Sequence, residues 1–159
     1  YDIHPYRFAR HRNSLYLQGF KPDDESIRTW KVDRIEAASV ETMPFTIPET
    51  LDLEAELAKG FGIFHSNDEP THVVIHFSKQ VARFVQESQW HPSQTNRLQP
   101  DGGLLVEFEV AGLEELKAWV LSFGGQAEVL EPTSLRNQIT DEARSLLKLY
   151  TTTRAPHPK

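Results

Sequence analysis

The sequence predicts an α+β protein in which a small β-sheet is followed by a mixed domain. Two observations lead to this prediction. Residues 1–40 consist of short runs of alternating apolar and polar residues separated by polar turns, a pattern typical of half-buried strands. From residue 72 onward, strand-like and helix-like periods succeed one another. The order strand, helix, strand, strand, helix, strand, helix is a split βαβ arrangement with one extra C-terminal helix.

The first part, residues 1–43, is expected to contain four short strands. Pro5 restricts the residue before it to extended backbone, which places the first strand near the N-terminus. A polar turn at residues 21–26 separates the second strand from the third. The strands are expected at residues 1–10, 14–20, 27–31 and 33–40. Short strands joined by tight turns predict a strongly bent sheet or a partial barrel.

Residues 44–71 are expected to form a linker with a short helix. The stretch from Pro44 to Thr50 contains prolines and shows no periodicity. Thr50 is expected to cap a helix over residues 51–59, which Gly60 then ends. At the other end of the chain, residues 151–159 are expected to be a disordered tail.

The second domain is expected over residues 72–150. Its best-defined feature is the clean alternation of residues 104–110, which follows a glycine-containing hairpin turn. Pro132 is expected to open the last helix. Strands are expected at residues 73–77, 94–98, 104–110 and 127–130, and helices at 79–88, 114–123 and from 132 onward. Trp119 is a candidate interface residue on the second of these helices.

Composition narrows the class of function. The formal net charge is -6, which argues against a general nucleic-acid binder. Residues 1–40 carry seven Lys and Arg against six Asp and Glu, a net +1, so the rest of the chain carries -7. An anionic ligand is therefore best tolerated in the N-terminal part. The chain has no cysteine and no run of the roughly 20 apolar residues that span a membrane, which favours a cytoplasmic protein with no membrane partner.

The best binding candidates are Arg28 and Arg34. A continuous strand would direct both to one face, whereas a bulge between them would separate them. Guanidinium groups bind phosphate oxygens through a rigid fork of donors, and Tyr16 could stack on a base. The alternative is that both arginines pair with neighbouring carboxylates on the surface and that Tyr16 is half-buried structure.

Other residues could extend this basic patch. His4 could donate a hydrogen bond to a phosphate, and Arg7 and Arg10 could add positive charge. The alternative is that His4 is an ordinary surface residue at a strand edge and that the two arginines only solvate an edge strand. In the second domain, His91 and Arg97 are candidates for reaching the same ligand.

No pattern points to catalysis. His72 and His76 are four residues apart, but in a strand-like run, where they lie too far apart to chelate a metal comfortably. No glycine-rich phosphate loop, nucleophile elbow or metalloprotease motif occurs. We therefore expect no enzyme activity, no metal and no cofactor.

Residues 1–40 resemble the WYL domain, named for a Trp-Tyr-Leu tripeptide that here reads Leu15-Tyr16-Leu17. The supporting residues are His4-Pro5-Tyr6, Gly19, and Arg28-Thr29-Trp30 through Asp33-Arg34-Ile35. The rest resembles the C-terminal extension, WCX, that accompanies WYL domains in bacterial transcriptional regulators. Its matching residues are Trp90-His91, Ser93-Gln94, Asp101-Gly102, Leu121 to Gly124 and Ala127 to Pro132. Leu15 departs from the tripeptide, since it stands in place of tryptophan.

The resemblance implies a small Sm-like (SH3-like) barrel followed by a ferredoxin-like domain. It also implies effector sensing and dimerisation in a regulator whose DNA-binding helix-turn-helix lies at the N-terminus. Because that DNA-binding domain and the first strand of the WYL domain would precede Tyr1, we expect the chain to be an N-terminally truncated fragment.

We therefore expect a homodimer that binds a nucleotide or short nucleic-acid effector and acts on promoter DNA through the missing helix-turn-helix. One alternative is an oligomerisation module without a ligand. The other is a sensor of a small anionic metabolite.

Overall fold

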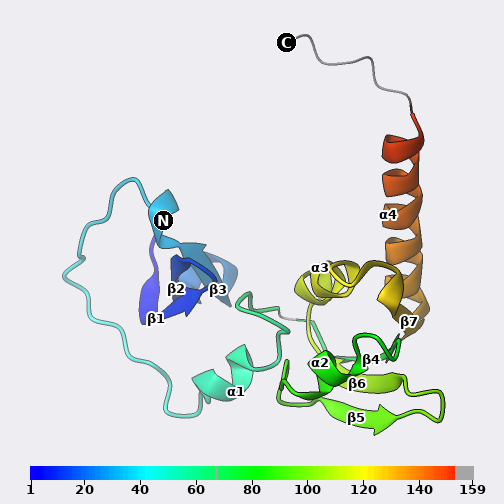
Figure 1. The fold of residues 1–159 in the computed structure, drawn as a ribbon. Coiled ribbons are helices and arrows are strands. Elements are labelled where there is room, and N and C mark those ends of the chain that lie inside the picture. Colours follow the sequence, from blue (N-terminus) through cyan, green and yellow to red (C-terminus); the bar gives the residue numbers. More distant parts are fainter. Residues whose placement is uncertain (67, 153–159) are drawn as a thin grey trace. The chain divides into compact units, whose positions relative to one another are not determined.

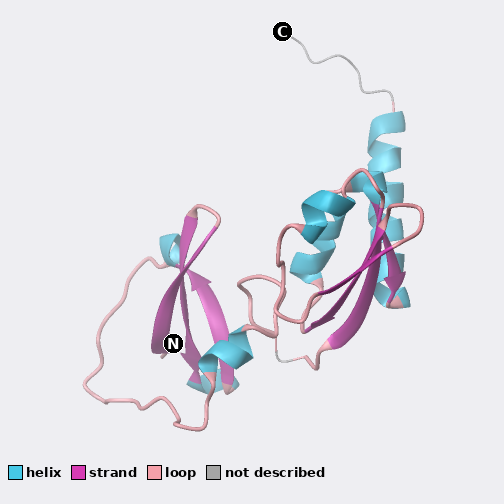
Figure 2. Ribbon diagram, turned by 60° about the horizontal axis from the view of Figure 1, so that its bottom comes forward, coloured by secondary structure: helices cyan, strands magenta, loops and turns pink. Residues whose placement is uncertain are grey.

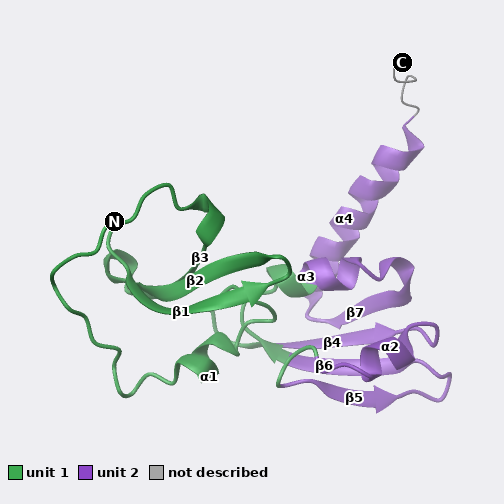
Figure 3. Cartoon of the chain, turned by 60° about the vertical axis from the view of Figure 1, so that its left-hand side comes forward, with its two compact units in different colours: residues 1–71, 90–92, 109–116 green, residues 72–89, 93–108, 117–159 purple. Residues whose placement is uncertain are grey.

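The computed structural model describes residues 1–66 and 68–152. The chain divides into two compact units, drawn in green and purple in Figure 3. The first unit comprises residues 1–71, 90–92 and 109–116, and the second comprises residues 72–89, 93–108 and 117–159. The predicted domain boundaries at 1–43, 44–71 and 72–150 remain predictions. The predicted tail at 151–159 lies, from residue 153 on, outside the described residues.

The first unit is built on a three-stranded antiparallel meander of β1 (His4–His11), β2 (Ser14–Lys21) and β3 (Ser26–Lys31), with β2 in the centre (Figure 1). A tight turn containing Arg12, at φ 49°, joins β1 to β2. The 3-10 turn η1 (Pro22–Asp24) joins β2 to β3. Short connections of this kind fix the register of neighbouring strands.

The fourth strand predicted at residues 33–40 is wrong. β3 ends at Lys31, the 3-10 turn η2 (Val32–Arg34) follows, and the chain then runs without a strand to α1 (Leu53–Leu57). Every residue from 33 to 50 is exposed. The run Ala37-Ala38-Ser39 supplies no large apolar side chain, so this segment gains little by adding to the sheet.

The linker helix is shorter than predicted. α1 begins at Leu53 because Asp52, not Thr50, caps it. The Asp52 Oδ1 atom accepts a hydrogen bond from the backbone N–H of Ala55 at 3.0 Å, which satisfies one of the free donors at a helix start.

The second sheet has four strands in the order β5-β6-β4-β7. β5 pairs antiparallel with β6, and β7 pairs antiparallel with β4. The strands are β4 (Thr71–Phe77), β5 (Thr95–Leu98), β6 (Leu104–Val110) and β7 (Ala127–Glu131). The helices are α2 (Ala82–Gln86), α3 (Glu114–Leu121), the 3-10 turn η3 (Gly124–Gln126) and α4 (Thr133–Thr151). This succession confirms the predicted order of elements and the α+β class.

One face of the second sheet forms the core of its unit. Alternate residues of β4 and β6 are fully or almost fully buried, namely Val73, Ile75, Phe77, Leu104, Val106 and Phe108. Trp119 of α3 contacts the Phe77 ring at 5.4 Å and the Phe108 ring at 5.9 Å between centroids. Trp119 therefore packs against this aromatic core, and its role at an interface stays a prediction.

The last helix, α4, is anchored only at its start. Leu135 is fully buried, and the Arg136 guanidinium donates to the carbonyl oxygen of Val129 and pairs with Glu128 of β7. All residues from 140 to 152 are exposed, and this half of the helix extends past the sheet (Figures 1 and 2). Among the described helices, none is both long and apolar enough to cross a lipid bilayer.

Candidate functional site

The strand register assigns the side chains of the meander to two different faces. Directly opposed residues of antiparallel strands point to the same side of a sheet. Phe8, Leu17 and Trp30 form one such row across β1, β2 and β3. Arg7, Gln18 and Thr29 form the next row, which must point to the other side.

We define the basic-aromatic face as the side carrying Phe8 and Arg10 of β1, Leu15 and Leu17 of β2, and Arg28 and Trp30 of β3. Arg10 is paired with Leu15, and Arg28 with Gly19. Phe8 is 66% exposed, and Leu15 is also exposed. The Tyr1 ring lies 6.4 Å from the Trp30 ring, and the Lys21 ammonium lies 5.1 Å above the Tyr1 ring. Aromatic planes and cations are thus accessible on one surface of the first unit.

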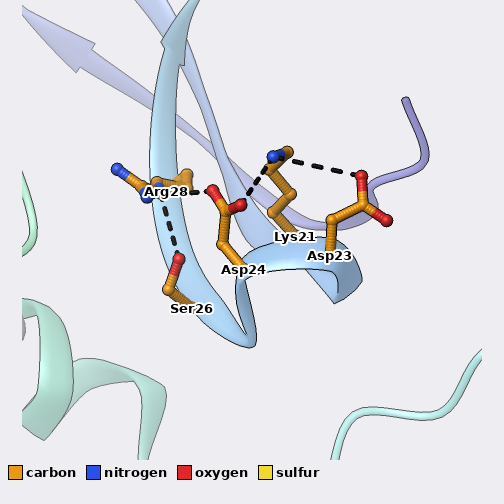
Figure 4. Close-up of polar contacts among 5 residues, drawn as sticks. All are labelled: Lys21, Asp23, Asp24, Ser26 and Arg28. Carbon is orange, nitrogen blue, oxygen red and sulfur yellow. Dashed lines mark hydrogen bonds and ion pairs between the residues drawn. The ribbon is translucent and has the colours of Figure 1, made fainter.

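Arg28 is held in place by the turn before its strand (Figure 4). Its Nε donates to Oγ of Ser26 at 3.0 Å, and its Nη2 donates to Oδ2 of Asp24 at 2.9 Å. Lys21 donates to the other oxygen of Asp24 at 2.8 Å. The hydrogen bond and the charge of Lys21, followed by the charge and hydrogen bond of Arg28, hold the pKa of the Asp24 carboxyl below its ordinary value. The Arg28 side chain is nevertheless 54% exposed, so it combines a fixed orientation with access to solvent.

The predicted pairing of Arg28 with Arg34 on one strand face is not realised. Arg34 lies in η2, after β3 has ended, so the alternation of a strand no longer relates the two positions. Arg34 and Arg10 are both exposed. Within the described part of the chain, neither makes an ion pair. Arg10 and Arg28 share the basic-aromatic face, whereas Arg34 lies beyond its end.

Arg7 and Tyr16 lie on the opposite side, which is contacted by α1 and by residues 63–64 after it. Arg7 Nε donates to Oε1 of Gln18 at 2.8 Å, and its Nη1 pairs with Glu54 of α1. The buried Gln18 donates through Nε2 to the carbonyl oxygen of Ile63 at 3.0 Å. Tyr16 contacts the Phe64 ring edge to face at 5.9 Å. These contacts match the structural alternative for Tyr16, and they draw Arg7 into an internal network.

His4 lies at the start of β1 on this covered side, opposite Phe20. Its ring is stacked on Phe45, with centroids 4.7 Å apart and planes 9° apart. His4 also lines a pocket of about 420 Å³. Of the predicted ligand-binding residues, His4 alone lines this pocket, so the structure separates it from Arg10 and Arg28.

The two candidates from the second domain have local roles. His91 is 5% exposed, and its ring stacks with Phe61 at 6.4 Å. Burial lowers the pKa of His91, while hydrogen bonds to the backbone of Ala58 and Lys59 act in the opposite direction. Arg97 of β5 pairs with Glu107 of β6 at 2.6 Å. A role for either residue toward the proposed ligand stays a prediction.

The sequence alone did not lead us to place Phe8 and Trp30 on the basic-aromatic face, or Lys21 beside it. Trp30 has the same parity as Arg28 on one strand, so the spacing alone could have placed them together. Phe8 required the register of the first hairpin, which depends on the short turn at Arg12. Within the described residues, no group of three or more His, Asp or Glu side chains could hold a metal ion.

Comparison with known families assigns both parts of the chain. Residues 1–40 match the WYL domain, and residues 69–147 match the WCX domain. The chain therefore belongs to the family of proteins that join a WYL domain to a WCX domain. Among solved structures, it is similar to the Proteasome accessory factor B/C (PafBC) of Arthrobacter aurescens, with 21% sequence identity and a TM-score of 0.45. That match covers 94% of this chain and 22% of the PafBC chain. A search of curated proteins finds no match.

Proposed function

We propose that this chain is the effector-sensing region of a bacterial WYL-family transcriptional regulator. In this proposal the basic-aromatic face binds a nucleotide or a short single-stranded nucleic acid. Binding controls a DNA-binding helix-turn-helix that lies outside this chain and acts on promoter DNA in the cytoplasm. The WYL and WCX domains support the regulator class.

One observation supports the ligand class above the others. Arg28 and Trp30 are two residues apart on β3 and share a face with Arg10 and Phe8. Single-stranded nucleic acids are held by cations along the backbone together with aromatic planes under the bases. Arg28 already has a fixed orientation through Ser26 and Asp24, so binding would cost little side-chain entropy.

Fluorescence polarisation with a labelled eight-nucleotide thymidine strand tests this proposal. We expect binding that weakens as salt rises, because bound cations release counterions from the phosphates. Arg28→Ala should weaken binding about ten-fold, the typical loss for a charge-assisted hydrogen bond. Arg83→Ala is the matched control, since Arg83 is an exposed arginine with one carboxylate partner, Glu87, in the second unit. Equal binding by the wild type and Arg28→Ala would overturn the proposal.

A small anionic metabolite is the alternative ligand for the same cations. It would need Arg28 and Arg10 but not the aromatic plane of Trp30. Trp30→Leu therefore separates the two ligand classes: it should weaken oligonucleotide binding and leave binding of inorganic phosphate or citrate unchanged.

A homodimer formed through α4 is the second candidate function. Leu146, Leu147, Leu149 and Tyr150 are all exposed on the part of α4 that extends past its sheet, with Tyr150 87% exposed. Ile139, Ala143, Leu146 and Tyr150 follow helical spacing, so a second copy could pack along this stripe. The stripe is self-complementary in an antiparallel pair, where Ile139 would meet Tyr150 and Ala143 would meet Leu146 of the second copy.

Light scattering tests this assembly. We expect a dimer for the wild type and a monomer for Leu146→Glu, because the new charge would be buried between two helices. Asn137→Glu makes the same charge change on the opposite side of α4 and should leave the dimer intact. A dimer that persists in Leu146→Glu would exclude the α4 stripe as its interface.

A further inference from the structure

We infer that the first unit carries a second ligand site, a pocket that binds a small organic cation. This inference goes beyond the proposed effector site and does not depend on it. The pocket is the cavity of about 420 Å³ at the end of the meander where β1 starts and β2 ends. Its volume lies within the range of small-molecule sites, roughly 300–1,000 Å³.

One wall of the pocket is aromatic. His4, Tyr6 and Phe20 line it. Phe45 stacks on His4 and lies 6.4 Å from Tyr6, and the His4 and Phe20 rings are 5.8 Å apart. The Tyr6 phenol is neutral near pH 7, as an ordinary tyrosine is, and burial raises its pKa further. Neighbouring aromatic faces attract ammonium groups, most strongly when the cation is desolvated.

Carboxylates supply the charge of the pocket. Glu25 and Glu56 both line it, and no Lys or Arg is among the described lining residues. Glu56 pairs with Lys59 at 2.6 Å, which offsets part of its charge. Glu25 makes no ion pair within the described part of the chain, because Lys21 and Arg28 both use Asp24 instead. Glu25 is therefore the carboxylate best placed to meet a cation.

Two hydroxyl groups, of Ser26 and Thr46, and the imidazole of His65 complete the polar lining. Ser26 is 4% exposed and also lines the pocket, while its Oγ accepts the hydrogen bond from Arg28 Nε. The pocket and the basic-aromatic face therefore meet at one buried side chain, yet they present opposite charges. A neutral molecule of the same shape gains the apolar contacts of the pocket but not the attraction to Glu25 and the aromatic faces.

Choline and its uncharged carbon isostere, 3,3-dimethylbutan-1-ol, form a matched pair of probes. We expect choline to shift the backbone amide NMR signals of residues 4, 6, 20 and 25–27 in a saturable titration of the full chain. The isostere should cause no saturable shift. Glu25→Gln should weaken choline binding about five-fold, the effect of removing one partly exposed ion pair. Phe20→Leu should weaken it as well.

Glu49→Gln is the control, since Glu49 is an exposed carboxylate in the adjoining loop that does not line the pocket. It should bind choline like the wild type, and thermal unfolding should verify that each variant is folded. Equal binding of choline and its isostere, no saturable shift with choline, or unchanged binding in Glu25→Gln would each overturn the inference. Arg28→Ala distinguishes the two sites, because it should weaken oligonucleotide binding about ten-fold and leave choline binding unchanged.

Discussion

The Nη2 atom of Arg28 lies 2.9 Å from Oδ2 of Asp24, so an internal carboxylate occupies part of the guanidinium that we propose as the anion contact. Asp24 orients Arg28, but it also competes with any phosphate. Asp24→Asn should therefore tighten oligonucleotide binding, by about two- to five-fold for an exposed ion pair. Fluorescence polarisation at low salt measures this change.

A matched variant controls for the change in net charge. Asp141→Asn removes a carboxylate that pairs with Arg144 at 3.1 Å on α4, and it should leave the affinity unchanged. If Asp24→Asn weakened binding, Asp24 would act as a positioning residue for Arg28 rather than as a competitor.

Gln18 is predicted to stabilise the first unit through its buried side chain. It is 2% exposed and bonds to both Arg7 and the Ile63 carbonyl. Gln18→Leu keeps the volume but removes the hydrogen bonds with Arg7 Nε and the Ile63 carbonyl, which leaves Arg7 its ion pair with Glu54 and Ile63 its hydrogen bond from Thr29. The loss of these two hydrogen bonds should lower the free energy of unfolding by about 1–3 kcal/mol. Urea unfolding combined with hydrogen exchange of the β2 amides measures the loss in this unit. The exposed Gln138→Leu should change stability by less than about 0.5 kcal/mol, and an equal effect of both variants would contradict the role of Gln18.

Gly19 is predicted to tolerate no side chain. A Cβ atom at this position would collide with the backbone carbonyl of His4 and lie 3.1 Å from Cα of Pro5. Gly19→Ala should therefore push β1 away from β2 and destabilise the first unit by about 1–3 kcal/mol. Gly125→Ala is the control, because a Cβ there meets no atom within 4 Å. Thermal unfolding compares the two, and similar melting temperatures would show that the strands separate without cost.

The burial of His91 predicts a dependence of stability on pH. Its pKa is lowered in the folded state from the ordinary value of 6.5, so below that pH the unfolded chain takes up a proton that the folded chain resists. Stability from this group is full above pH 6.5 and is lost as the pH falls toward the folded-state pKa. Urea unfolding between pH 7.5 and 5 should show a decline that is smaller in His91→Gln. An equal decline in both proteins would assign the effect to the other histidines.

The sequence predicted the class of fold well because periodicity is a local property. The alternation in β4 and β6 and the helical spacing in α3 and α4 are visible in short windows, so the order of elements in the second sheet was predicted correctly. The fourth strand failed because residues 33–40 were assigned without a strong alternating pattern. Local propensity alone is a weak guide for such a segment.

The composition of the candidate site was harder to predict. Tyr16 and Arg28 point to opposite sides because of the register between β2 and β3, in which Tyr16 opposes Lys31 and Gly19 opposes Arg28, and this register rests on the turn η1. The burial of Gln18 depends on Ile63, which lies 45 residues away in the sequence. Neither relationship leaves a signal within a single strand, whereas the shared parity of Arg28 and Trp30 does.

The left-handed backbone of Glu25, at φ 48°, lets neighbouring residues of one turn serve the two proposed sites. It reverses the chain between Asp24, which meets Arg28, and Ser26, which starts the next strand. In our two proposals, consecutive acids therefore act on separate ligands: Asp24 would set how strongly the anion is held, and Glu25 would set how strongly the cation is bound. Substitutions in this single turn could retune either preference independently, without any rearrangement of the strands that flank it.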